Sequence, residues 1–347
     1  MCRLGTSSSF WTYRRAFSVP FLLCFAFSVN AQETPATQQY AQRLFVNPAF
    51  AGLLSEYSAT AGHRSQWTGT ENGFSTQWLS GEYRFEESKT AVGVTVLSDR
   101  SAAGGFSRVQ AGAMYAYHTK LKPKLDFSAG LQAAYASQRA GFSNLIFEDQ
   151  LDPDGTVQQP SAENNRFSRT SYLTVSTGLL LYTNQFWLGV SAQHLNNPAI
   201  GNSLHSNLPP LLQVQTGYRF YAKSYFARNH FEEISFIPTF SFAQQRNFKR
   251  LDFVFYSVIT PVTLGVGYTT LPGTSATSSA SAFTALAGIT YKSFKFGYSY
   301  RQPLGQTHVA LGPGHEVSLS FQLVDYRKIY KKLGSSKNYN RIACPEF

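Results

Sequence analysis

The residues best suited to chemistry stand in one short run, HRSQW at positions 63–67. A histidine can act as a general base and an arginine as a clamp for an anion, so His63 and Arg64 could form a small active site. No serine or cysteine stands at a recognisable spacing from His63 to serve as its nucleophile. The alternative is the end of a membrane-spanning strand, where Trp67 joins an interfacial belt and Arg64 meets lipid phosphates or turns inward onto an acid. We favour this second interpretation and expect no enzyme activity.

Two further groups of residues could bind a metal ion. Asp149, Asp152 and Asp154 lie close together in a long loop, and Ca²⁺ prefers several carboxylates on a flexible chain. The run lacks EF-hand spacing and a distal glutamate, and Asp-Pro and Asp-Gly also make ordinary turns, so it is a weak calcium candidate. His118 and His315 stand singly, without the spacing of zinc ligands. We expect no resident metal and no cofactor.

The start of the chain is typical of a secretory signal peptide. Basic residues precede an apolar run at 16–27, and small residues precede a cleavage site after Ala31. The apolar run is too short to span a bilayer. Cleavage removes three of 30 lysines and arginines, so the mature chain carries 27 against 19 acids, a net charge of +8. It also leaves Cys344 as the single cysteine, which excludes an intramolecular disulfide.

The composition of the mature chain indicates a membrane β-barrel. Charged residues make up 14% of the sequence and aromatic residues 15%, whereas ordinary soluble domains have about 25% charged residues. After the signal peptide there is no apolar run of about 18 residues, which excludes helical membrane spans. An exported chain of this kind is typical of outer-membrane barrels, in which lipid-facing and lumen-facing residues alternate.

Alternation of apolar and polar residues supports this class segment by segment. In FKFGYSYR, residues 294–301, all four aromatic side chains fall on one face of an extended chain, and polar residues or glycine on the other. Pro238 is an exception inside its segment, because proline removes a strand hydrogen bond. Counting such segments predicts fourteen strands, an even number as in single-chain bacterial barrels. They span residues 55–64, 74–85, 90–99, 105–119, 124–139, 168–183, 186–195, 211–222, 232–245, 248–259, 262–271, 281–291, 294–302 and 315–326.

The lengths of the connections alternate as well. Links after even-numbered strands are mostly tight and links after odd-numbered strands mostly long, as expected for short periplasmic turns and longer extracellular loops. The tight links are 86–89, 121–123, 184–185, 260–261 and 292–293; the long ones are 65–73, 141–167, 196–210, 272–280 and 303–314. The exceptions are a short outer link at 245–247 and a longer inner link at 223–231. A soluble all-β fold, the alternative, would not be expected to show this alternation.

Positive charge gathers on the side that these lengths assign to the periplasm. This basic face consists of Lys120, Lys122, Lys124, Arg327, Lys328, Lys331 and Lys332, the last four in a tail over residues 327–347. It could simply keep the rim solvated and meet anionic headgroups, or it could dock a partner in the periplasm. We expect no nucleic-acid partner, since the chain is exported and lacks a binding motif.

Several short motifs together resemble a known family. They are Asn47, Pro48, Ala51 and Gly52 in NPAFAG; His63, Arg64, Gln66 and Trp67 in GHRSQW; Asp99-Arg100; Gly104-Gly105; YAYH at 115–118; His315 and Glu316 in GHEVSL; and CPEF at 344–347. In this order they resemble the PorP/SprF family, outer-membrane proteins associated with type IX secretion and gliding motility in Bacteroidota. The resemblance implies a non-enzymatic barrel that helps large secreted adhesins or other type IX cargo reach or stay on the cell surface. It implies as partners a cargo with a C-terminal sorting domain and subunits of the secretion machinery.

The expected strand number predicts a lumen that side chains alone cannot fill. Eight strands can be filled by side chains, whereas sixteen or more leave a water channel, so fourteen should leave space for a plug or a passenger. Residues 32–54 are one candidate, because Asn47-Pro48 and the small residues beside it suit a compact turn inside the wall. The long loop at 141–167 is another.

We therefore predict a signal peptide at 1–31, an N-terminal periplasmic or plug segment at 32–54, a barrel integral to the outer membrane at 55–326 and a basic periplasmic tail at 327–347. The predicted function is assistance to the secretion, anchoring or display of type IX cargo, with outer-membrane lipid as a further partner. A porin or transporter for small hydrophobic or polar solutes is the alternative.

Overall fold

The structure is a computed structural model that describes residues 36–68, 73–85, 87–101, 105–139, 151, 154, 169–201, 207–227, 230–272, 280–304 and 312–323. The predicted signal peptide and the predicted basic tail lie outside these residues. Of the loop predicted at 141–167, only Leu151 and Asp154 are described.

Fifteen strands and two short helical turns make up the described chain. The turns are α1 Arg43–Val46 and η1 Pro48–Phe50; the strands are β1 Tyr57–Gln66, β2 Phe74–Phe85, β3 Thr90–Ser101, β4 Ser107–Lys122, β5 Leu125–Arg139, β6 Thr170–Tyr182, β7 Phe186–Gln193, β8 Leu211–Tyr218, β9 Phe220–Ala227, β10 His230–Gln245, β11 Phe248–Ile259, β12 Val262–Leu271, β13 Ala280–Tyr291, β14 Phe294–Leu304 and β15 Gly314–Leu323. Three of the predicted strands, 74–85, 248–259 and 262–271, have the bounds that the structure gives.

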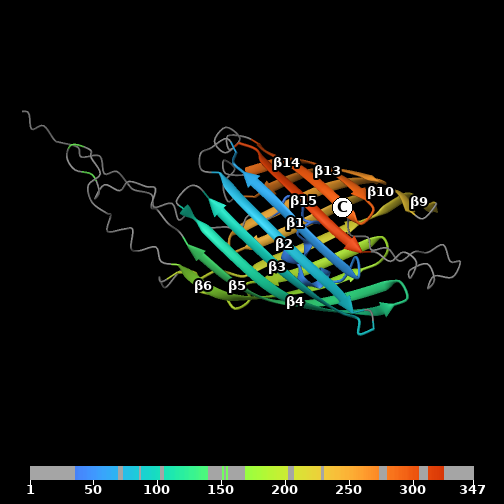
Figure 1. The fold of residues 1–347 in the computed structure, drawn as a ribbon, viewed down its shortest axis with the longest axis horizontal. Helices are drawn as coiled ribbons and strands as arrows, with labels where there is room; N and C mark the ends of the chain where they lie inside the picture. The colour runs from blue at the N-terminus through green and yellow to red at the C-terminus, as the bar shows by residue number, and fades with distance from the viewer. Residues whose placement is uncertain are drawn as a thin grey trace, which may run out of the picture. The chain divides into compact units, whose positions relative to one another are not determined.

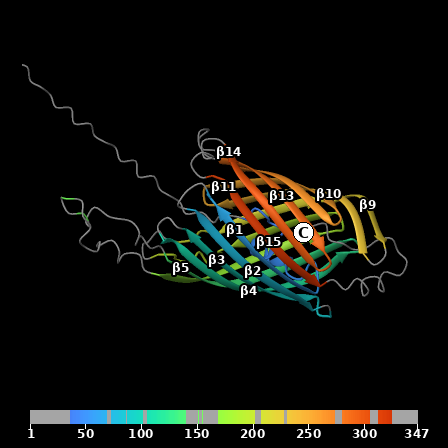
Figure 2. The same cartoon turned by 45° about the horizontal axis from the view of Figure 1, so that its top comes forward.

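The strands form one antiparallel sheet that closes on itself (Figures 1 and 2). Most strands pair with their neighbours in the chain, β1 pairs with β15, and β10 pairs with β11. β8 and β9 pair with opposite ends of β10, so the ring has fourteen positions and one of them holds two short strands. The predicted fourteen-stranded antiparallel barrel is confirmed. The longer inner link predicted at 223–231 is wrong, because these residues continue as β9 and form a hairpin with the start of β10.

Side chains alternate between the two faces of the wall. In β3, Val92, Val94 and Val96 are 40%, 59% and 44% exposed, whereas Ala91 and Thr95 are buried. Large apolar side chains are exposed in this way on strands all around the ring, which is the arrangement of a sheet that faces lipid. Within the described ranges, neither helical turn has the length of apolar chain that a membrane crossing requires.

The pairing of β10 is interrupted on one side. β10 pairs with β8 over Thr239–Gln245 and with β9 over His230–Phe236, and neither strand pairs with Ile237 or Pro238. The pairing of β10 with β11 continues through Pro238 without interruption. The hydrogen bond that proline cannot donate is therefore given up on the β8–β9 side, which explains how a strand interior accommodates this residue.

The N-terminal segment, residues 36–55, lies inside the ring of strands. Figure 1 shows it in blue behind β1 and β2. Its Leu44 and Phe50 belong to one buried cluster with Leu180, Ile237 and Tyr256 of the wall. This buried cluster is thus the contact between the segment and the lumen side of the barrel.

Candidate functional site

The buried carboxylate of Glu82 on β2 anchors the C-terminal part of the N-terminal segment, near the start of β1. The Glu82 side chain accepts hydrogen bonds from the Ser58 hydroxyl at 2.7 Å and from the Gly52 backbone N–H at 3.0 Å. It also forms an ion pair with Arg43 of α1, and both side chains are more than nine-tenths buried. A buried carboxylate is stable only with such partners. Glu82 therefore holds two separate points of the segment.

A second carboxylate, on β15, holds the other end of the segment. The backbone N–H groups of Thr37 and Gln38 donate to the two oxygens of Glu316 at 2.9 and 3.1 Å. The Gln38 amide in turn donates to the Glu316 carbonyl at 2.8 Å, and Ser318 donates to the Gln38 side chain at 2.6 Å. Glu316 is 1% exposed. The segment is thus fastened to residues that follow it by about 280 positions in the chain.

The Asn47-Pro48 turn packs against the wall on the opposite side of the lumen. Asn47 caps η1 by accepting from the Ala49 N–H at 2.9 Å, and its amide donates to the carbonyls of Leu179 at 3.2 Å and Val190 at 3.3 Å. Asn47 is completely buried. The turn therefore bonds to β6 and β7, whereas Glu82 and Glu316 belong to β2 and β15.

Glycines in the wall make room for this turn. A Cβ at Gly178 would lie 1.9 Å from Asn47 Oδ1, and a Cβ at Gly130 would lie 2.4 Å from the Pro48 carbonyl carbon. Real Cβ atoms do not approach so closely, so only glycine allows the backbone of the turn to lie directly on β5 and β6.

Two polar side chains of the wall complete the contacts of the turn. The Ser128 hydroxyl donates to the Ala49 carbonyl at 2.8 Å, and His118 Nε2 lies 2.8 Å from the Ala51 carbonyl oxygen. Both wall residues are buried. His118 thus helps to hold the N-terminal segment against the wall. The sequence did not suggest this role, because no other histidine stands near His118.

The residues of the run HRSQW divide between the two faces of the wall. β1 directs His63 to the outer face and Arg64 to the lumen, because consecutive strand residues face opposite sides. Arg64 is buried and donates to the Thr76 hydroxyl at 3.1 Å. Gln66 is buried like Arg64, and Trp67 follows the strand with its ring 6.1 Å from that of Phe74. The interfacial role predicted for this run stays a prediction.

A polar network in the lumen was missed by the sequence reasoning. Asp252 on β11 forms an ion pair with Arg250 at 2.8 Å and accepts from Thr269 at 2.7 Å. The Gln39 amide of the segment also donates to Asp252, at 3.2 Å. Arg250, Asp252, Thr269 and Arg301 line a small pocket with about 260 Å³ of empty space. Alternation along β11 places its even-numbered residues inward, but pairing with residue 39 cannot be read from the strand itself.

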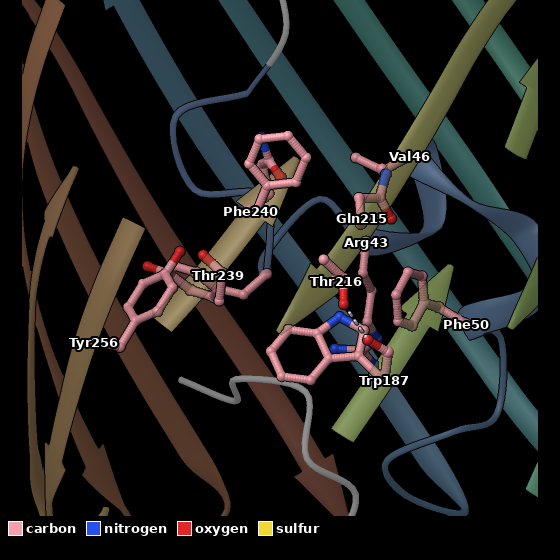
Figure 3. Close-up of a pocket in the computed structure, with 11 residues that line it drawn as sticks. Arg43, Val46, Phe50, Trp187, Gln215, Thr216, Thr239, Phe240 and Tyr256 are labelled. Carbon is pink, nitrogen blue, oxygen red and sulfur yellow. Dashed lines mark hydrogen bonds between the residues drawn. The ribbon is translucent and has the colours of Figure 1, made fainter. Parts of the chain in front are cut away.

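A larger pocket lies between the segment and the wall near the irregular part of β10 (Figure 3). The space between its lining atoms amounts to about 430 Å³, part of which is open to solvent. Its lining comes from the segment and from β7, β8, β10 and β11: Gln39, Tyr40, Arg43, Val46, Phe50, Trp187, Gln215, Thr216, Thr239, Phe240 and Tyr256. Burial, and next the nearby Tyr256 phenol, raise the pKa of the Tyr40 phenol well above its usual range, so the Tyr40 side chain is neutral.

The remaining predicted residues do not converge on a site. Lys120, Lys122 and Lys124 are exposed at or beside the β4–β5 turn. The four basic residues of the tail lie outside the described residues. Asp149 and Asp152 lie outside them as well. His315 is placed 2.8 Å from the Tyr298 hydroxyl. In the described part of the chain, no three His, Cys, Asp or Glu side chains are grouped so that they could hold a metal ion.

Comparison with known proteins gives a family match and several distant barrels. Residues 28–321 match a family model described as "Type IX secretion system membrane protein PorP/SprF". No curated protein matches the chain. The toluene transporter TbuX of Ralstonia pickettii is 12% identical to this chain, with a TM-score of 0.48. The match covers 81% of this chain and 93% of the transporter. For the toluene transporter TodX of P. putida these values are 10%, 0.47, 81% and 93%. For a FadL homologue of Pseudomonas aeruginosa they are 11%, 0.43, 81% and 93%.

Proposed function

We propose, for a chain that belongs to the PorP/SprF family of type IX secretion membrane proteins, that it acts as a non-enzymatic outer-membrane anchor that assists the secretion or surface display of type IX cargo. Its partners in this role are a secreted protein with a C-terminal sorting domain and subunits of the secretion machinery in the periplasm.

The observation that carries this proposal is the filled lumen. The N-terminal segment bonds to β2, β15, β6 and β7, so it crosses the interior and is held on several sides. Two pockets beside it have about 430 and 260 Å³ of space between their atoms, and neither is large enough for a folded domain. A barrel filled in this way supports docking of cargo on its surface rather than passage of cargo through its centre.

The exposed lysines near the β4–β5 turn support a docking role at one rim. Lys120, Lys122 and Lys124 lie within five residues of one another, and like charges so close favour an acidic partner surface or anionic headgroups. We propose the acidic surface of a periplasmic subunit as the partner of this rim.

Affinity capture from native outer membranes tests both partners. The tagged barrel should recover one or a few secreted proteins that carry a type IX sorting domain, together with a periplasmic subunit. A variant with Lys120, Lys122 and Lys124 changed to Gln should lose the periplasmic subunit and keep the cargo, whereas changing Lys249 and Lys292 to Gln is the matched control. Recovery of no protein with a sorting domain would contradict the proposed function.

A further inference from the structure

The pocket of about 430 Å³ has the composition of a small-molecule site. Ligand pockets are mostly apolar, with a few polar groups that fix the orientation of the ligand. Here Trp187, Phe50 and Tyr256 supply flat apolar surface, and the side chains of Gln215 and Arg43 supply polar atoms (Figure 3).

One of these polar groups lacks a partner. Arg43 is 6% exposed, and its Nη2 is used by Ser58 and Glu82. Its Nε–H, also buried, has no hydrogen-bond acceptor among the described residues. A buried donor without an acceptor is costly, at about 1–3 kcal/mol. A ligand that places an acceptor oxygen there would remove this cost.

The pocket also adjoins the irregular part of the wall. Thr216 and Phe240 are opposite one another on β8 and β10 and face outward, as shown by the contact of Phe240 with the exposed ring of Phe253. Both nevertheless line the pocket, together with the inward-facing Thr239. The adjacent pair positions, at Ile237 and Pro238, lack a partner on β8 or β9. The pocket therefore lies against the one stretch of β10 where the wall has lost its hydrogen bonds to β8 and β9.

We propose that this pocket binds a single-chain amphiphile from the bilayer, with a short acyl chain against Trp187 and a carboxylate or ester carbonyl that accepts from Arg43 Nε. The lipid-facing position of Phe240 and Thr216 gives the ligand access from the membrane. A free solute from the aqueous phase is not required. This inference does not depend on type IX cargo, so either proposal can fail alone.

Quenching of Trp187 fluorescence by bromine tests the site, because bromine quenches only an indole that it touches. The probes are 8-bromooctanoic acid and 1-bromooctane, added to the purified, folded barrel. We expect saturable quenching by 8-bromooctanoic acid that disappears in Trp187→Phe. Quenching that is non-saturable, or unchanged in Trp187→Phe, would come from the detergent phase around the other tryptophans and would overturn the proposal.

Two variants test the place and the chemistry of binding. Thr239→Phe should fill the pocket and abolish saturable quenching, whereas Thr284→Phe, a lumen-facing control outside this pocket, should retain it. Arg43→Lys keeps the charge opposite Glu82 and removes the Nε–H. It should weaken 8-bromooctanoic acid about tenfold and leave 1-bromooctane unchanged. Equal effects on both probes, or none on either, would contradict the assigned acceptor contact even if Thr239→Phe does not fold.

Discussion

Replacing Gly178 with alanine should dislodge the Asn47 turn from the wall. The new Cβ would lie 1.9 Å from Asn47 Oδ1 and 3.1 Å from Pro48 Cδ, so the turn must move away from β6. The Asn47 amide would then lose its hydrogen bonds to the carbonyls of Leu179 and Val190.

The size of the effect follows from these two bonds. Each hydrogen bond contributes about 0.5–1.5 kcal/mol net, so the loss of both costs about 1–3 kcal/mol. Since about 1.4 kcal/mol corresponds to a tenfold change in an equilibrium constant, the fraction of molecules with the turn released should rise by about fivefold to a hundredfold. The barrel itself should stay folded, because its strands pair independently of the turn.

Hydrogen exchange measures this release directly. The backbone N–H groups of Phe50 and Ala51 donate within the turn, to Asn47 and Pro48 at 3.2 Å each, and exchange only when the turn opens. In Gly178→Ala their exchange should accelerate by the same factor. Gly81→Ala is the matched control, because a Cβ there would meet Val94 at an ordinary 3.7 Å.

An unchanged exchange rate at Phe50 and Ala51 in a folded Gly178→Ala barrel would refute the reasoning. It would mean that β6 yields instead of the turn, and that the glycine does not determine how the segment is seated. Acceleration of similar size in Gly81→Ala would refute it as well, because the effect would then come from the whole barrel.

Three further predictions concern the same segment. Glu82→Ala leaves the buried Arg43 charge unpaired and should lower the free energy of unfolding in urea by about 3–5 kcal/mol. The double variant Arg43→Ala with Glu82→Ala should lose less stability than the two single variants added together. Additive losses would contradict the Arg43–Glu82 ion pair. The raised pKa of Tyr40 means that its phenol ionises at higher pH than an ordinary tyrosine, so Tyr40→Phe should remove one high-pH step from the absorbance titration at about 295 nm. Because the folded form favours the neutral phenol, the stability of the fold should fall as the pH rises above about 10. Deletion of residues 32–54 should give a steady increase in single-channel conductance, whereas unchanged conductance in a folded barrel would exclude the segment as a plug.

The wall of the barrel could be predicted from the sequence because each strand carries its own signal. The sequence pattern predicted the strands 74–85 and 248–259 with the bounds that the structure gives. Pro238 was recognised as an irregularity, but its consequence depends on β8 and β9, which lie on another segment of the chain. The local pattern around a proline does not indicate which neighbouring strand lacks the hydrogen bond that the proline cannot donate.

The joint between segment and wall could be predicted only in outline. Asn47-Pro48 indicated a compact turn, and small residues indicated close packing. The partners are glycines and carboxylates that lie 30 to 279 positions away, such as Glu82 and Glu316. Gly178 carries no side chain and could have served any turn or bulge. Such a contact depends on the register of all the strands around the closed barrel. No single segment of the sequence contains that information.

The motifs that resemble the family have a common place in the structure. Asn47 and Pro48 form the turn, Gly52 donates to Glu82, and Glu316 accepts from the first described residues of the segment. Each of them fixes residues 36–55 against the inside of the wall. We infer that these motifs specify how the N-terminal segment is seated inside the barrel, and the proposed docking of cargo on the barrel surface depends on that seating.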